Sequence, residues 1–146
     1  MKRYANYIIL PEYRLILECC KGKASVKHAI KMKQDEISDA LYDPRYSILV
    51  DFREFETILN AETTKSIFRF FDFLKGIEIK SKVAFLTEEP HQVVISIILK
   101  ELGSGFDSIK VEVFSTVEAA AKYLGIPDEF HYLINNEIAE LNKNTV

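Results

Sequence analysis

The order of its apolar segments is the feature of this sequence that most constrains the fold. Short runs rich in β-branched and aromatic residues have the length of strands, and they cover residues 4–10, 14–20, 47–52, 82–87 and 110–114. From the second run onward, each is followed by a longer segment with helical spacing. This alternation predicts a largely parallel sheet with helices packed against it. Residues 11–13 join the first two runs too briefly for a crossover, so these two are expected to form an antiparallel hairpin.

The helical segments are predicted at residues 26–42, 61–75, 90–102, 117–124 and 128–141. Ser25 and Asn60 are good N-caps, because their side-chain oxygens can accept from unpaired amides of the first turn. Ser115 and Glu118 form a capping-box pattern before the fourth segment. The chain end, residues 142–145, is expected to fray. The fold class predicted is thus α/β, with a mixed, mostly parallel five-stranded sheet.

Length and charge narrow the class of protein. The chain has 146 residues, the size of one domain. Its 19 basic and 22 acidic residues give a net charge of −3, which argues against a general nucleic-acid binder. No apolar run approaches the ~20 residues of a membrane-spanning helix, and the basic start lacks the apolar stretch of a secretory signal. The sequence therefore indicates a cytoplasmic protein without a membrane span.

The residues that commonly hold metals or form disulfides are few. Cys19 and Cys20 are the only cysteines, and they are adjacent in a predicted strand. Neighbouring strand side chains point to opposite faces, so we expect one buried thiol, one partly exposed thiol and no disulfide between them. The three histidines are scattered, and no glycine-rich phosphate loop is present. The sequence therefore predicts no metal and no cofactor.

Several short phrases occur in a familiar order. A hairpin leads into a helix after Gly22, Tyr-Asp-Pro-Arg-Tyr at residues 42–46 precedes a strand ending Leu-Val-Asp-Phe-Arg, and a late strand runs into Ser-Thr-Val-Glu-Ala-Ala-Ala-Lys-Tyr-Leu-Gly at residues 115–125. In this order the chain resembles the SpoIIAA-like branch of the STAS fold, the fold of anti-anti-sigma factors. The resemblance implies a STAS-like domain over residues 1–125. Residues 126–146 are then a helical extension that packs on the same domain or on a partner.

The resemblance breaks at the family's phosphorylation motif. Sporulation-type members carry a phosphorylatable Ser after the central strand, in an Asp-Ser-Ser-Gly setting. The matching residues 51–57 contain neither Ser nor Gly, and Thr57 is the nearest hydroxyl. A phosphate there would meet the charge of two nearby acidic residues. We therefore expect no phosphorylation switch.

Polar residues follow two of the predicted parallel strands and are candidates for a ligand site. Asp51, Arg53 and Glu54 follow the central strand, and Thr87 and Glu88 follow the next. In open α/β sheets, ligands bind outside the carboxyl ends of the strands. The same residues could instead cap loops and form ion pairs.

The helix at residues 90–102 is apolar nearly all round, so it must be covered on both sides. One side is the sheet. The other could be covered by the C-terminal helix or by a second subunit, or it could form a groove for an apolar ligand. The residues considered for such an interface are Phe68, Phe73, Val93, Ile97, Phe130 and Ile134.

These observations favour a non-catalytic regulatory or protein-interaction domain of STAS-like type, with a protein partner or a homodimer. The first alternative is a carrier or sensor of a small apolar or lipid-like ligand, which some relatives of this fold suggest and which needs a cavity of ~300 Å³ or more. The second is a small enzyme with an acidic site formed by Asp51, Arg53 and Glu88.

Overall fold

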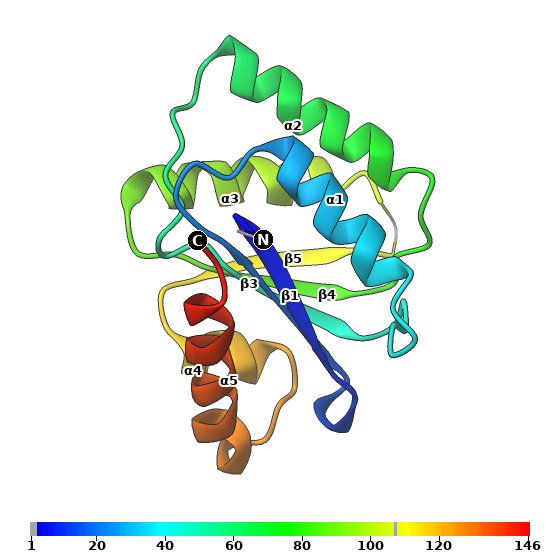
Figure 1. Cartoon of the computed structure of the whole chain (residues 1–146), viewed down its shortest axis with the longest axis vertical. Coiled ribbons are helices and arrows are strands. Elements are labelled where there is room, and N and C mark those ends of the chain that lie inside the picture. The colour runs from blue at the N-terminus through cyan, green and yellow to red at the C-terminus, as the bar shows by residue number, and fades with distance from the viewer. Residues whose placement is uncertain (1–2, 107) are drawn as a thin grey trace.

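A single mixed sheet runs through the middle of the molecule in the computed structural model, which describes residues 3–106 and 108–146 (Figure 1). Its strands follow the order of the chain: β1 (Ala5–Leu10), β2 (Leu15–Cys20), β3 (Ser47–Asp51), β4 (Lys82–Leu86) and β5 (Lys110–Phe114). Only the β1–β2 pair is antiparallel, and the other pairs are parallel. The predicted hairpin and the mostly parallel five-stranded sheet are confirmed.

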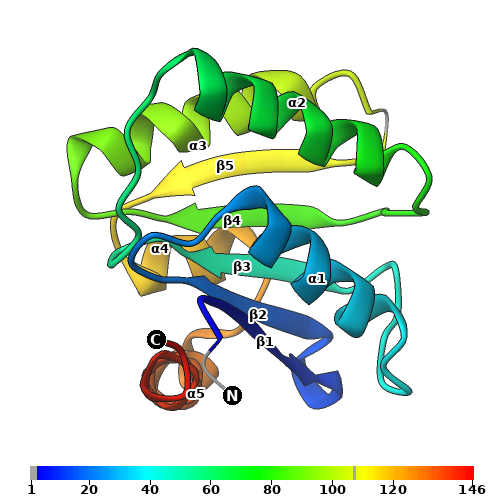
Figure 2. The same ribbon diagram turned by 45° about the horizontal axis from the view of Figure 1, so that its top comes forward.

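Both faces of the sheet are covered by helices (Figure 2). On one face lie α1 (Val26–Ile37), α2 (Ala61–Leu74) and α3 (Pro90–Gly103). On the other lie α4 (Val117–Tyr123) and α5 (His131–Lys143), which follows a 3-10 turn over Asp128–Phe130. The central strands bury apolar side chains on both faces, as continuous apolar runs predict.

The helix predicted at residues 26–42 is shorter than expected. α1 ends at Ile37, and Ser38 caps it. The side chain of Asp39 then accepts the backbone N–H of Leu41 at 2.9 Å, which favours a turn over further helix. The apolar residues after position 37 suggested helix, but this local hydrogen bond ends it.

The capping box at Ser115 was also placed one residue early. Thr116 is the N-cap of α4, and its side chain accepts the backbone N–H of Ala119 at 3.2 Å. Ser115 is exposed. Both residues have a suitable hydroxyl, so only the position of the first helical turn distinguishes them.

The C-terminal end is anchored rather than frayed. Thr145 is buried and donates its hydroxyl to the carbonyl of Leu141 at 2.7 Å. The backbone N–H of Val146 donates to the carbonyl of Arg3 at 2.7 Å. A backbone hydrogen bond therefore joins the C-terminal residue to the first described residue, Arg3.

The helix α5 does not cover α3, as one prediction had it. Ile134, Ile138 and Leu141 pack with α4 and the opposite face of the sheet. That face is apolar in its own right, through Leu17, Leu49 and neighbouring residues, and it requires its own cover. The C-terminal segment therefore belongs to the same core as the sheet.

The cysteines differ from the expectation of one buried and one partly exposed thiol. Both thiols are buried, and burial raises their pKa values, that of Cys19 to about 12.

In the described ranges of the chain, no helix has the length and apolar character needed to cross a membrane.

Candidate functional site: an apolar cavity

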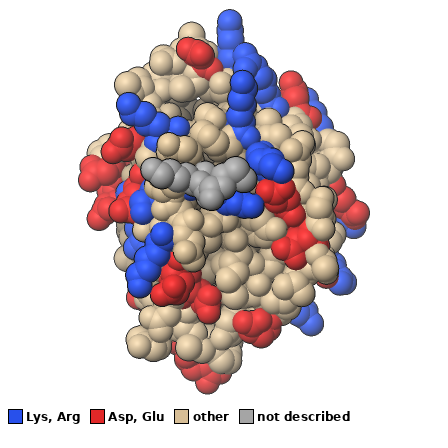
Figure 3. All heavy atoms as spheres, viewed as in Figure 1, with Lys and Arg blue, Asp and Glu red and all other residues tan. Residues whose placement is uncertain are grey.

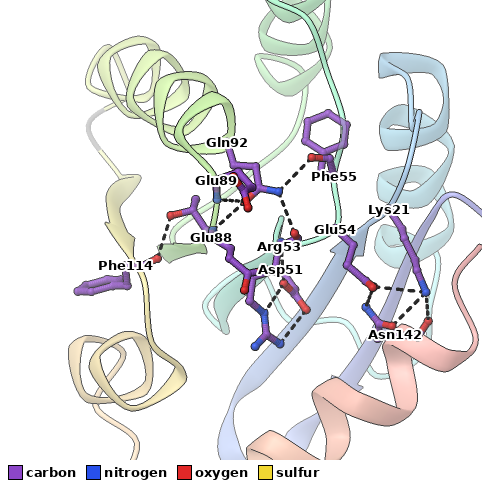
Figure 4. A network of polar contacts seen from close by, with 11 residues as sticks. Lys21, Asp51, Arg53, Glu54, Phe55, Glu88, Glu89, Gln92, Phe114 and Asn142 are labelled. Carbon is purple, nitrogen blue, oxygen red and sulfur yellow. Dashed lines mark hydrogen bonds and ion pairs between the residues drawn. The ribbon is translucent and has the colours of Figure 1, made fainter.

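The predicted polar edge is a network of internal hydrogen bonds (Figure 4). Asp51 is buried, and its carboxylate accepts from the side chain of Arg53 at 3.0 and 3.2 Å and from the Arg53 backbone N–H at 3.0 Å. Thr87 is buried as well and donates to the carbonyl of Phe114 at 3.2 Å. Thr87 thus links the ends of β4 and β5, and the Asp51–Arg53 pair stabilises the turn at the end of β3.

Gln92, which the sequence analysis did not single out, completes this network. It is buried at the start of α3 and accepts the backbone N–H groups of Glu88 and Glu89 at 2.7 and 2.9 Å. Its amide donates to the carbonyls of Arg53 and Phe55 at 2.9 and 3.1 Å. Gln92 thus ties the loop after β3 to α3, and the side chain of Glu88 remains exposed.

Glu54 lies on the other side of this loop, toward α5. It pairs with Lys21 at 3.4 Å and accepts from Asn142 at 2.6 Å, and the hydrogen bond from Asn142 lowers the pKa of its carboxyl. The five predicted residues therefore do not converge on one open site. Their hydrogen bonds are those of a structural network.

An apolar hollow lies elsewhere, between the sheet and the helices α1, α2 and α3. It is a cavity of about 340 Å³, lined mostly by apolar side chains. Ile48, Val50, Val83 and Phe85 form its floor on the sheet, and α2 roofs it with Ile67, Phe71 and Leu74, among other residues. α2 lies outside α1 and α3 in both ribbon views, on the side away from the sheet (Figures 1 and 2).

One end of the cavity reaches the surface. Among its lining residues, Ser25 and Glu62 are exposed, and both lie at the N-terminal ends of α1 and α2. Thr57 lines the same end and also a second, more open hollow of about 460 Å³ beside it, which includes Lys23 and His91. Thr57 is thus in the loop before α2, whose N-cap is Asn60. The opposite end is lined by residues such as Leu74, Ile79 and Ile109.

Three titratable side chains are buried at the α1 side of the cavity. Lys33 of α1 donates to Glu18 of β2 and, at 3.1 Å, to Glu36 of α1. The exposed fractions of the side chains are 8% for Lys33, 5% for Glu18 and 1% for Glu36. Glu18 and Lys33 line the cavity itself. We refer to these three residues as the buried triad.

Two carboxyl groups share one ammonium in the buried triad, and Glu36 is the more deeply buried of the two. Burial, followed by the charge of Glu18, raises the pKa of Glu36 to about 9, so this carboxyl holds a proton at neutral pH. Burial alone would lower the pKa of Lys33, but Glu18 and Glu36 raise it above its usual value. The triad is therefore an anion, a cation and a neutral acid, with no net charge.

The sequence suggested an apolar cavity only as one alternative, without its position beneath α2, and the triad was not predicted. Glu18 stands within an otherwise apolar strand, and Lys33 follows the buried Met32. Charged residues are almost never fully buried unless they are paired, so a Glu inside such a strand was the available signal. In the residues that the structure describes, no group of three or more His, Cys, Asp or Glu side chains could hold a metal ion.

The residues considered for an interface are distributed over both faces of the sheet. Phe68 of α2 and Ile97 of α3 are exposed, by 52% and 47%. Ile134 is fully buried against the sheet, so its side chain is not available to a partner. The rest are partly buried, namely Phe73, Val93 and Phe130.

Charged side chains on the surface are mixed in sign. On the face shown in Figure 3, a narrow run of Lys and Arg side chains crosses the upper part, and elsewhere Lys and Arg lie among Asp and Glu.

Comparison with protein-family models found no match, and searches of curated proteins and of solved structures found none either.

Proposed function

We propose that this chain is a non-catalytic domain that binds a small apolar molecule in the cavity beneath α2, as a carrier or sensor. The observation that carries the proposal is the size and lining of the cavity. Its volume of about 340 Å³ falls within the ~300–1,000 Å³ of ligand pockets, and most of its lining is apolar.

Packing energetics support the same proposal. Protein interiors rarely contain voids much larger than a water molecule. This cavity opens to the surface beside Ser25 and Glu62, so without a ligand its mostly apolar lining would face water. An apolar ligand would remove that lining from water, at ~25 cal/mol per Å² of apolar surface buried, and the opening offers a route of entry.

The fold is consistent with this function. The hairpin followed by alternating helices and strands supports a SpoIIAA-like STAS domain, which we propose as the family. Thr57 does not sit at the N-cap of α2, where the phosphorylatable Ser of sporulation-type members would be expected, so we propose no phosphorylation switch.

A native mass measurement on the purified full chain tests the proposal, with small molecules extracted in parallel. We expect a retained or exchangeable apolar molecule. Ala29 lines the cavity from α1, so Ala29→Leu should fill part of the space and abolish retention. Ala139→Leu, an exposed position on α5, is the matched control and should retain the molecule. Equal retention by both variants would place the ligand outside the cavity and contradict the proposal.

A protein-interaction domain is the second candidate. The observation that favours it is the exposed apolar surface of Phe68, Val94 and Ile97. The same mass measurement tests it, because Ile97→Glu should dissociate a complex or homodimer formed through this surface. If the native chain and the variant are both monomeric, interaction through a homodimer is contradicted.

A further inference from the structure

The buried triad determines which polar group a ligand can bring into the cavity. Glu18 and Lys33 are cavity-lining residues with side-chain exposures of 5% and 8%. Other polar lining residues, such as Ser25, Glu62 and Thr63, lie at the open end. Away from the opening, a ligand that fills the cavity therefore meets one buried pair of charged groups, Glu18 and Lys33, besides the half-buried hydroxyl of Ser66 on α2.

The ammonium group of Lys33 already has two carboxyl partners. Lys33 is the only basic residue among the described residues that line the cavity, and it lies between Glu18 and Glu36. An anionic group placed beside Lys33 would therefore also lie beside Glu18. A buried charge without a partner of its own is strongly unfavourable.

A cationic group also fails to find a free counter-charge. Glu18 is neutralised by Lys33, and Glu36, which does not line the cavity, is buried behind them with its proton retained. A ligand ammonium would have to compete with Lys33 for the same carboxylate.

Hydrogen-bonding capacity nevertheless remains at this contact. An ammonium has three N–H donors, and Lys33 directs two hydrogen bonds to the carboxyl groups of Glu18 and Glu36. A carboxylate offers about four acceptor sites, so Glu18 can accept more than the Lys33 bond. The pair therefore presents a donor next to an acceptor. A hydroxyl or a primary amide matches that arrangement, because each group both donates and accepts.

We propose that the cavity selects an electrically neutral apolar molecule that carries a hydroxyl or amide group, bound through Glu18 and Lys33, and that it rejects the corresponding carboxylates and amines. This inference rests on the proposed function, because it names the class of ligand for the same cavity.

A series of ligands that differ only in the head group tests it. Decan-1-ol, decanamide, decanoate and decylammonium are titrated into the full chain at neutral pH, below their aggregation concentrations. Displacement of a neutral fluorescent naphthylamine probe reports binding. We expect the alcohol and the amide to bind about tenfold or more tightly than either ion, since the ions must be buried without a partner.

A double variant reverses the expected selectivity. Glu18→Gln with Glu36→Gln leaves Lys33 without a carboxylate, so decanoate should gain affinity by about tenfold or more relative to decan-1-ol. The control Glu112→Gln changes a strand glutamate that pairs with Lys100 and is absent from the cavity lining, and the order of affinities should not change.

The outcomes separate the two proposals. If decanoate or decylammonium binds the native chain as tightly as the alcohol, the inference about the head group is overturned and the cavity remains a ligand site. If none of the four displaces the probe from the native chain, or if Ala29→Leu binds all four unchanged, the proposed function fails as well. The native series decides these points even if the double variant does not fold.

Discussion

At the scale of single residues, Glu36 couples folding to pH. Its pKa is about 9 in the folded chain, against an ordinary value of 4.5, chiefly because it is buried and secondly because Glu18 is charged. Between these two values the folded state holds a proton that the unfolded state has released. The free energy of unfolding contributed by Glu36 therefore falls as the pH rises through this window.

The variant Glu36→Gln removes this dependence, because the amide resembles the protonated acid and does not titrate. We expect it to be more stable than the native chain by about 1 kcal/mol or more at ~pH 8, since even one pKa unit corresponds to ~1.4 kcal/mol. The advantage should shrink toward ~pH 5. Urea unfolding at both pH values measures it.

The control for this experiment is Glu140→Gln, an exposed glutamate on α5 that pairs with Lys143. Its pH dependence of stability should match that of the native chain. If Glu36→Gln loses stability with rising pH as steeply as the native protein, Glu36 is ionised in the folded state.

The cap of α4 provides a second test at the residue scale. Thr116→Ala removes the side-chain acceptor of the Ala119 amide, and we expect a loss of about 1 kcal/mol. Ser115→Ala, on the adjacent exposed hydroxyl residue, should change the free energy of unfolding by less than about 0.5 kcal/mol. Denaturant melts of the two variants compare them directly. A larger loss for Ser115→Ala would place the helix start one residue earlier.

At the scale of elements, α5 is a structural helix that completes one face of the sheet. Ile134 is fully buried there, whereas its neighbour Leu133 is 43% exposed. Burial of the α5 stripe against Leu17 and Leu49 offsets the entropy lost when the segment is ordered.

The adjacent pair Ile134 and Leu133 gives a matched test of this role. Ile134→Ala should lower the free energy of unfolding by about 2–5 kcal/mol, because it leaves a cavity in a packed core. Leu133→Ala should cost less than about 1 kcal/mol, since Leu133 is already 43% exposed and its truncation leaves no closed cavity. Thermal and urea melts of both variants measure the difference. Equal, small losses would show that α5 is not docked on the sheet.

At the scale of the whole molecule, the cavity is bounded by the sheet and by the helices α1, α2 and α3. A ligand beneath α2 contacts the sheet and the helices together, so binding and global stability should be linked. At a free concentration of ~100 times its dissociation constant, a ligand specific for the folded state adds about 2.7 kcal/mol to the free energy of unfolding.

We therefore expect decan-1-ol to raise the melting temperature of the native chain in a concentration-dependent way. The Ala29→Leu variant, whose added methyl groups occupy the cavity, should show little increase, and Ala139→Leu should respond like the native chain. Differential scanning calorimetry measures the three series. A similar rise in all three proteins would indicate binding at the surface.

Local patterns in the sequence determined most of the secondary structure. Strand residues alternate or run as short apolar blocks, helical residues recur every three or four positions, and Pro11 and Asn60 mark boundaries. These signals depend only on near neighbours in the chain. The β1–β2 hairpin and the parallel order of the remaining strands follow from them, since connection lengths leave few other topologies.

Only the tertiary structure decided where these elements pack and what they enclose. From its apolar residues alone, α5 could pack on α3 or on the sheet. In the structure it packs on the sheet, because the face that contains Leu17 and Leu49 is apolar and needs a cover. Glu18, Lys33 and Glu36 come from two elements, and the pKa of Glu36 rises because folding buries it, and secondly because it lies beside the charge of Glu18. The periodicity of α2 marks Ile67, Phe71 and Leu74 as inward-facing, but the spacing between α2 and the sheet leaves the cavity beneath them. Periodicity records which side of a helix avoids water, whereas a cavity depends on distances between side chains that are far apart in the sequence.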